Sequence, residues 1–200
     1  DTTNFVDSIL ISQNASTGTL SSASNNTGLG DSVFAALTSG VNNTAVGYNA
    51  MVANTTGSSN AFNTAVGRDA LAANTTGHSN VAVGALALDA NTTGLGLTAV
   101  GYNAATTMTT GGAETVAIGF EALKLATATG NTAVGYKAGT SISTGEDNCF
   151  IGNFAGDATT TADNNTALGA FSLSANTTGT FNASVGASSL TSNTTGSNNI

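Results

Sequence analysis

The chain lacks several features that most globular domains use. Its 200 residues include no proline, no tryptophan, one cysteine and one histidine, and only 7% of them are charged. A single cysteine excludes an internal disulfide, and no apolar run reaches the 18 residues that a membrane-spanning helix needs. Three basic residues stand against eleven acidic ones, for a net charge of −8. This balance argues against binding to nucleic acid and to anionic membrane surfaces.

The composition nevertheless favours a folded chain. Disordered segments combine high charge with low hydrophobicity, whereas 40% of these residues are hydrophobic and 25 are glycine. Most of the apolar residues are alanine and valine, so we expect a core that is thin and repeated.

One motif recurs along the whole chain. Asn43-Thr44-Ala45-Val46-Gly47 is a typical copy, and eleven copies begin near residues 8, 26, 43, 63, 80, 97, 115, 131, 148, 165 and 182. No change of composition interrupts the series, so residues 1–200 are predicted to be a single repetitive segment. Because the chain begins without Met and ends at Asn199-Ile200, which resembles the start of another copy, we expect the segment to be cut from a longer protein.

A repeat of about 17 residues restricts the possible folds. It is too short for a helix pair, and Asn, Thr and Gly are poor helix formers. The motif alternates over a few residues, as a short strand does, and Asn54-Thr55-Thr56-Gly57 supplies turn residues. The sequence therefore predicts an all-β, parallel β-solenoid of about eleven coils, forming a rod of roughly 50 Å.

Two rows of apolar residues are candidates for the core. The fourth place of the motif is aliphatic in every copy and is predicted to be the structural core row, so Val100→Asp should bury a charge and disrupt the stack. The members of this row are Ile11, Leu29, Val46, Val66, Val83, Val100, Ile118, Val134, Ile151, Leu168 and Val185. A second apolar place follows five residues later, at Phe34, Met51, Leu71, Leu88, Leu123, Leu173 and Leu190.

The opposite face of the strand carries small residues in most copies. Alanine precedes the aliphatic residue in most copies, and a glycine row follows it. Two interpretations are open: another backbone packs flat against this face, as at a contact between subunits, or the small residues allow tight packing inside the same coil. The predicted close-packing row is Gly30, Gly47, Gly67, Gly84, Gly101, Gly119, Gly135, Gly152, Gly169 and Gly186.

Polar rows also repeat with the motif. Asparagine begins eight copies, which predicts a ladder of side-chain hydrogen bonds along the stack; these are Asn26, Asn43, Asn63, Asn80, Asn131, Asn148, Asn165 and Asn182. Thr-Thr pairs recur in the turns, where they either solvate the turn or form a hydroxyl surface for glycan or ice. Several Asn-x-Thr/Ser sequons follow from the same repetition, and they matter only on a glycosylating secretory route.

No residue stands out as a catalytic, cofactor-binding or metal-binding site. His78 lacks partners for a triad or a metal, and Cys149 occupies a place usually held by Thr. Glu146-Asp147 and Asp157 with Asp163 could bind Ca²⁺, but the G-G-x-G-x-D signature of calcium-binding rolls is missing. We therefore predict no cofactor and no enzymatic activity.

The copies resemble a known family of repeats. The segments from Asn43 to Ala50 and from Asn54 to Gly57, and above all Thr115-Val116-Ala117-Ile118-Gly119, are similar to the head repeat of YadA-like trimeric autotransporter adhesins (N-S-V-A-I-G) and to repeats in phage tail fibres. The resemblance covers essentially the whole chain, although the adhesin repeat is usually shorter. It implies a left-handed β-roll and a homotrimer, with the small-residue face as a candidate contact between subunits.

The expected function is structural. The leading hypothesis is the trimeric shaft of a phage tail fibre, carried on the virion, with a host glycan or receptor bound at a distal tip outside this segment. One alternative is the head or stalk of an extracellular bacterial adhesin. Another is a solenoid whose threonine array binds glycan or ice. The sequence that follows residue 200 in the full protein would separate fibre from adhesin.

Overall fold

The computed structural model describes residues 5–6, 9–11, 23–55, 61–109 and 114–200. Within these ranges the regular structure consists of strands alone, and no helix is long and apolar enough to cross a membrane. The strands are β1 (Phe5–Val6), β2 (Ile9–Ile11), β3 (Ala23–Ser24), β4 (Thr27–Leu29), β5 (Thr44–Val46), β6 (Thr64–Val66), β7 (Val81–Val83), β8 (Thr98–Val100), β9 (Val116–Ile118), β10 (Thr132–Val134), β11 (Cys149–Ile151), β12 (Thr166–Leu168) and β13 (Ala183–Val185).

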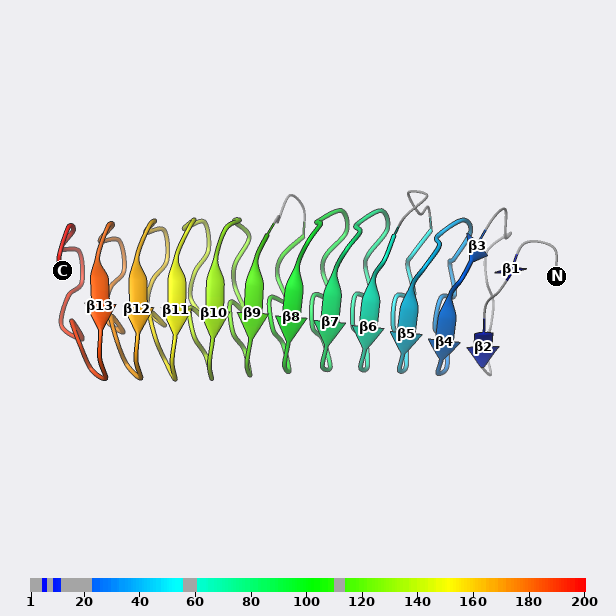
Figure 1. Ribbon diagram of the computed structural model, residues 1–200, viewed down its shortest axis with the longest axis horizontal. Helices are drawn as coiled ribbons and strands as arrows, with labels where there is room; N and C mark the ends of the chain where they lie inside the picture. The colour runs from blue at the N-terminus through cyan, green and yellow to red at the C-terminus, as the bar shows by residue number, and fades with distance from the viewer. Residues whose placement is uncertain (1–4, 7–8, 12–22, 56–60, 110–113) are drawn as a thin grey trace.

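Eleven of these strands form one parallel sheet that runs the length of the rod. Its order is β2, then β4 to β13 in sequence, so each strand pairs with the strand of the next copy (Figure 1). Equivalent residues are partners throughout; Thr98, Ala99 and Val100, for example, pair with Val116, Ala117 and Ile118. Each predicted copy contributes one strand, the first being described only over Ile9–Ile11. The predicted parallel β-solenoid is therefore confirmed. β1 and β3 form a separate two-stranded sheet.

A glycine ends each strand from β4 to β13 and turns the chain into the next side of the coil. The φ angles of this row lie between 118° and 142°, a region that L side chains rarely adopt. From Gly30 to Gly169, a Cβ would also stand less than 3.0 Å from the backbone of the equivalent glycine one coil further on. The close-packing prediction is confirmed, and the packing partner is the next coil of the same chain.

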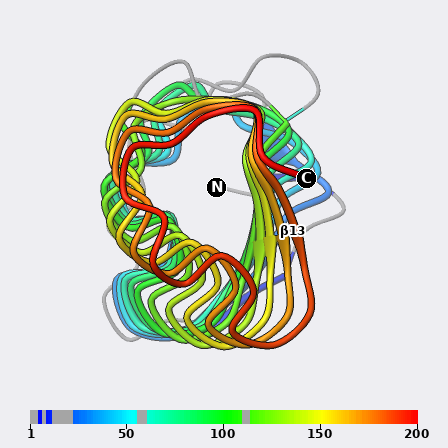
Figure 2. The same cartoon turned by 90° about the vertical axis from the view of Figure 1, so that its left-hand side faces the viewer.

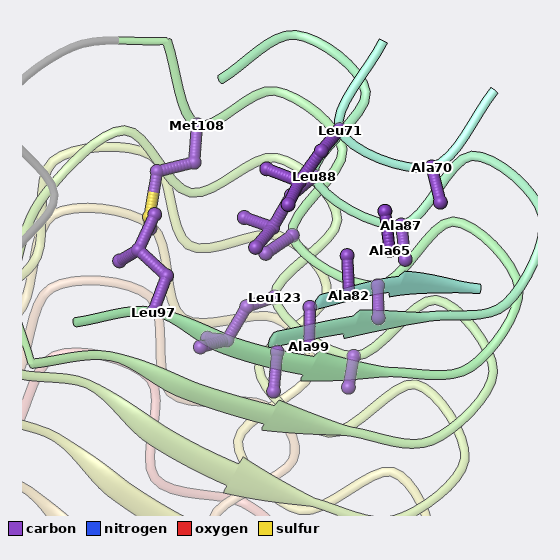
Figure 3. Packing of buried hydrophobic residues seen from close by; sticks show 14 of the residues in the cluster. Ala65, Ala70, Leu71, Ala82, Ala87, Leu88, Leu97, Ala99, Met108 and Leu123 are labelled. Carbon is purple, nitrogen blue, oxygen red and sulfur yellow. The ribbon is translucent and has the colours of Figure 1, made fainter. Parts of the chain in front are cut away.

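The interior is lined by alanine on one side and by larger residues on the other. Ala65, Ala82 and Ala99 point inward from successive strands, and Leu71, Leu88 and Leu123 approach them from across the coil (Figure 3). The second predicted apolar row is confirmed: its members from Phe34 to Leu173 are completely buried, and Leu190 packs against the core. Figure 2 shows the coils superimposed down the axis, with the sheet forming one wall.

Larger substitutions in this core occur in compensating groups. Phe150 takes the inward place of β11, where most strands have alanine, and is completely buried. Gly139 and Gly156 stand where other coils carry leucine, and a Cβ on either would lie within 3.0 Å of the Phe150 ring. A similar exchange at the other end places Leu10 and Phe34 around Gly28. A large residue on one side of the coil is thus matched by a glycine beside it, as close packing of the interior requires.

The predicted asparagine ladder is also present. The Asn131 Oδ1 accepts hydrogen bonds from the backbone N–H and the side chain of Asn148, both at 3.1 Å, and the Asn148 Oδ1 binds Asn165 in the same way. The Nδ2 of Asn148 also donates to a carbonyl of its own coil, on Ala162. All eight predicted members are at most 2% exposed. These bonds satisfy buried polar groups and tie neighbouring coils together.

Candidate functional site: the outer face of the sheet

The aliphatic row predicted to be the core lies on the outer face of the sheet. Ile118 is 37% exposed, Ile151 38%, Leu168 45% and Val185 70%, whereas the alanine beside Ile118 is completely buried. The middle residue of each three-residue strand points into the coil, so its two neighbours point out. The interior assignment is therefore wrong for all eleven members: Ile11, Leu29, Val46, Val66, Val83, Val100, Ile118, Val134, Ile151, Leu168 and Val185.

The small-residue face is correspondingly the interior. Ala45, Ala65, Ala82, Ala99 and Ala117 have no exposed surface in the single chain. The proposed packing of another subunit against this face is therefore wrong, because the chain's own coil already fills the space beside it.

A second row accompanies the aliphatic one on the outer face. It holds the first residue of each strand, and its side chains are small, β-branched or aliphatic: Ile9, Thr27, Thr44, Thr64, Val81, Thr98, Val116, Thr132, Cys149, Thr166 and Ala183. All members described by their burial are half-buried or exposed. The two rows together form what we call the outer face, and no strand contributes a charged residue to it.

An aromatic ladder follows the sheet at the corner of five successive coils. The ring centroids of Tyr102, Phe120, Tyr136, Phe154 and Phe171 lie 5.2–5.4 Å apart from one coil to the next. Three of the four contacts are stacked, with interplanar angles of 12–22°. Such stacking uses the ring faces within the ladder and stabilises the stack of coils. The sequence analysis missed this ladder, although an aromatic residue after Gly47, Gly101, Gly119 and Gly135 could have indicated it.

A small charged group borders the aromatic ladder. The Glu121 Oε1 lies 2.8 Å from the Lys124 Nζ, and the Glu121 Oε2 lies 3.6 Å from the Lys137 Nζ. Lys137 also lies over the Tyr136 ring, with its Nζ 5.5 Å from the centroid. The hydrogen bond from Lys124, assisted by the charge of Lys137, lowers the pKa of the Glu121 carboxyl. Two of the chain's three basic residues are therefore engaged with Glu121.

The threonine pairs divide into two rows with different roles. In the pairs that begin at Thr75, Thr92 and Thr177, the first hydroxyl donates to the backbone carbonyl of the next coil, for example from Thr75 to Thr92 (3.1 Å) and from Thr177 to Thr194 (3.0 Å). The second residue is exposed, and Thr56 lies outside the described residues. Within the described chain, the second-row hydroxyls bond to no other residue; these are Thr76, Thr93, Thr144, Thr161, Thr178 and Thr195.

The remaining reactive side chains are not brought together. His78 lies beside Ser79, with Nδ1 and Oγ 3.4 Å apart, and Cys149 is half-buried on the outer face. Asp163 uses its Oδ1 to accept the Glu146 backbone N–H at 2.8 Å. Among the described residues, no three His, Cys, Asp or Glu side chains converge on a position for a metal ion.

Asp157 is the most unusual of these groups. Its Oδ1 is buried and has no hydrogen-bond partner, and the same is true of the Thr159 Oγ1 two residues away. Burial raises the pKa of the Asp157 carboxyl, against a smaller opposing effect from backbone hydrogen bonds and Lys137. This pair is a local weakness in the core, because unpaired buried polar groups destabilise a fold.

Comparisons of the chain with protein-family models, curated proteins and solved structures found no match.

Proposed function

We propose that this chain is a structural fibre segment, the trimeric shaft of a phage tail fibre that takes part in host attachment. The single observation that carries the proposal is the unbroken, in-register stack of eleven strands, in which neighbouring coils repeat the same contacts. A stack of this kind grows in one dimension and suits a rod that spaces two ends apart. The host glycan or receptor would be bound by a tip beyond this segment.

The distribution of side chains supports a mechanical role. The glycine corners, asparagine ladder and aromatic ladder all connect one coil with the next, so they resist separation of the coils along the axis. The residues with reactive side chains are scattered over different coils of the described chain. Repeated cohesion along the axis is what a shaft requires.

The oligomeric state is tested by light scattering. The proposal expects a mass of about three times the 19.4 kDa of one chain, and small-angle scattering should show a rod. A folded sample with the mass of one chain contradicts the trimer.

The phage assignment is tested separately. Antibodies against this segment, viewed by immunogold electron microscopy, should label the tails of virions whose genome carries the gene. Labelling of the surface of uninfected bacteria that carry the gene would instead favour the adhesin.

The exposed threonine row favours a second candidate function. Equivalent threonine hydroxyls recur in most coils, with Ser39 and Ala128 in their place in two, and they are unbonded within the described chain, so they form a polar array that could bind glycan or ice. Thermal hysteresis or binding on a glycan array, lost when Thr144, Thr161 and Thr178 are all changed to Ala, would support this role. Absence of both activities in the parent protein would exclude it.

A further inference from the structure

We propose that the outer face of the eleven-stranded sheet is the surface through which three copies of this chain pack, side by side and parallel, around a common axis. This inference rests on the proposed homotrimer and assigns the surface that forms it. It replaces the small-residue face, which lies inside the coil.

The first argument is the charge pattern. The chain carries eleven acidic and three basic residues, yet none falls on the outer face in any of its eleven strands. A strand surface that faces water normally carries charged residues, which also protect a sheet from unwanted association. The outer face is therefore uncharged along its whole length, so packing another copy against it would bury no charge.

The second argument is the exposed apolar surface. Every residue of the aliphatic row is Val, Ile or Leu, and Leu29, Ile118 and Leu168 are each more than a third exposed in the single chain. Eleven strands about 4.8 Å apart and about 10 Å long give a face of roughly 500 Å². The aliphatic row supplies about half of this face, and a contiguous apolar strip of that size is typical of an interaction site.

The third argument concerns which partner fits. The outer face is long and narrow, and its two rows repeat at the spacing of the coils along the whole sheet. A second copy has rows of the same spacing, so parallel copies around an axis along the rod bring equivalent levels together. A globular partner would cover only part of such a strip.

The aromatic ladder and the Glu121 group beside the outer face extend the surface available for contact. About 800 Å² per partner is typical of a stable complex, more than the sheet alone provides. The ladder of Tyr102, Phe120 and Tyr136 follows strands β8–β10 directly and can extend the contact with half-exposed rings. The Glu121 group lies just beyond this ladder, which matches the polar rim that surrounds protein interfaces.

The test measures the accessibility of two cysteines placed, one at a time, on one coil. In a C149T background, Thr166→Cys puts a thiol on the outer face and Thr178→Cys puts one in the turn of the same coil. Both threonines are exposed in the single chain, and the native Cys149 shows that the outer face accepts cysteine. The probe is a maleimide reagent under native conditions, and light scattering on the same samples gives the mass.

We expect both variants to have the trimer mass. The outer-face thiol of Thr166→Cys should react at least about tenfold more slowly than the turn thiol of Thr178→Cys, because labelling it would require the interface to open. Equal labelling rates in a trimer overturn this inference and leave the trimer intact. A folded chain of monomer mass overturns both the inference and the proposed trimer. Protection of the turn thiol of Thr178→Cys alone would show that the turns, and not the sheet, form the contact.

Discussion

The inner and outer faces of the same sheet follow different rules. The inward residue is alanine in most strands, and each exception is matched by a change nearby: Phe150 lies beside two glycines, and the Ser184 Oγ bonds to the Ser172 Oγ at 2.7 Å. Of the outward residues, the first of each strand varies among Ile, Thr, Val, Cys and Ala, whereas the third is always Val, Ile or Leu. The inner face is thus constrained by volume, and the outer face by one row that is always aliphatic and by the absence of charge. The predictions below test this difference, from the largest expected effect to the smallest.

An added charge should destabilise the single chain on the inner face of the sheet and leave it folded on the outer face. Ala99 is completely buried, so Ala99→Asp places an unpaired charge in the core and should cost about 3–5 kcal/mol, or abolish folding. Val100 is half-exposed on the outer face, so Val100→Asp should retain the β circular dichroism of the parent. Thermal melts of both variants make the comparison. Equal loss of structure in the two would show that the faces are not distinct.

The corner glycines can be tested with a matched pair. Gly84 and Gly186 both have positive φ, but a Cβ on Gly84 meets the backbone of Gly101, whereas one on Gly186 meets nothing within 4 Å. Gly84→Ala should therefore destabilise by about 3 kcal/mol or more, from strain and overlap. Gly186→Ala should cost about 1 kcal/mol, from strain alone. Denaturant titrations measure both, and similar losses would contradict the close packing between coils.

The exchanged core at β11 should behave as a unit. Phe150→Ala should cost about 3–5 kcal/mol, because it leaves a cavity beside Gly139 and Gly156. Gly156→Leu alone should also destabilise, since its side chain would overlap the Phe150 ring. The backbone there already has φ 58°, close to the 50° of Leu88 in a regular coil. The double variant should therefore be more stable than the sum of the single changes by more than about 1 kcal/mol; simple additivity would refute the compensation.

The smallest effects come from two carboxyls with opposite pKa shifts. Asp157 has a raised pKa. Its favourable contribution to the free energy of unfolding is therefore complete below the ordinary pKa of about 3.9 and is lost as the pH rises through the pKa of the folded state. Glu121 has a lowered pKa. Its favourable contribution to the free energy of unfolding is therefore present above the ordinary pKa of a glutamate and is lost as the pH falls through the pKa of the folded state.

Melting temperatures at pH 3 and pH 7 test this pair. Asp157→Asn should be stabilised relative to the parent at pH 7 more than at pH 3. Glu121→Gln should lose stability at pH 7 and approach the parent at low pH. If the two variants shift in the same direction at pH 7, the assigned environments are wrong.

Much of this architecture could be predicted from the sequence, because the repeat itself encodes it. The spacing located one strand per copy, and the recurring asparagines and leucines indicated rows that are indeed buried. Alternation also showed that Ala99 and Val100 lie on opposite faces. It could not show which face is inside, and the larger, more hydrophobic valine suggested the wrong answer. The narrow coil reverses this preference, because Leu88 and Leu123 already fill the space that Ala99 faces.

Other features were missed because they depend on contacts across coils. The compensation around Phe150 joins residues of two successive copies and has no counterpart in the consensus. The aromatic ladder shifts by one place between Tyr136 and Phe154, which obscures it in an aligned repeat. The phage and trimer assignments depend on resemblance and stay proposals.

The central claim is that a single chain buries the inner face of its sheet, whereas the outer face is buried only when the chain associates with other copies. The most direct measurement is light scattering of the Val83→Asp/Val100→Asp/Val134→Asp triple variant beside the parent, with circular dichroism on both samples. The account predicts a trimer for the parent and a folded single chain for the variant, because three charges per chain would face one another across the interface. A folded variant that still has the trimer mass, or one that loses its β structure, would contradict the account.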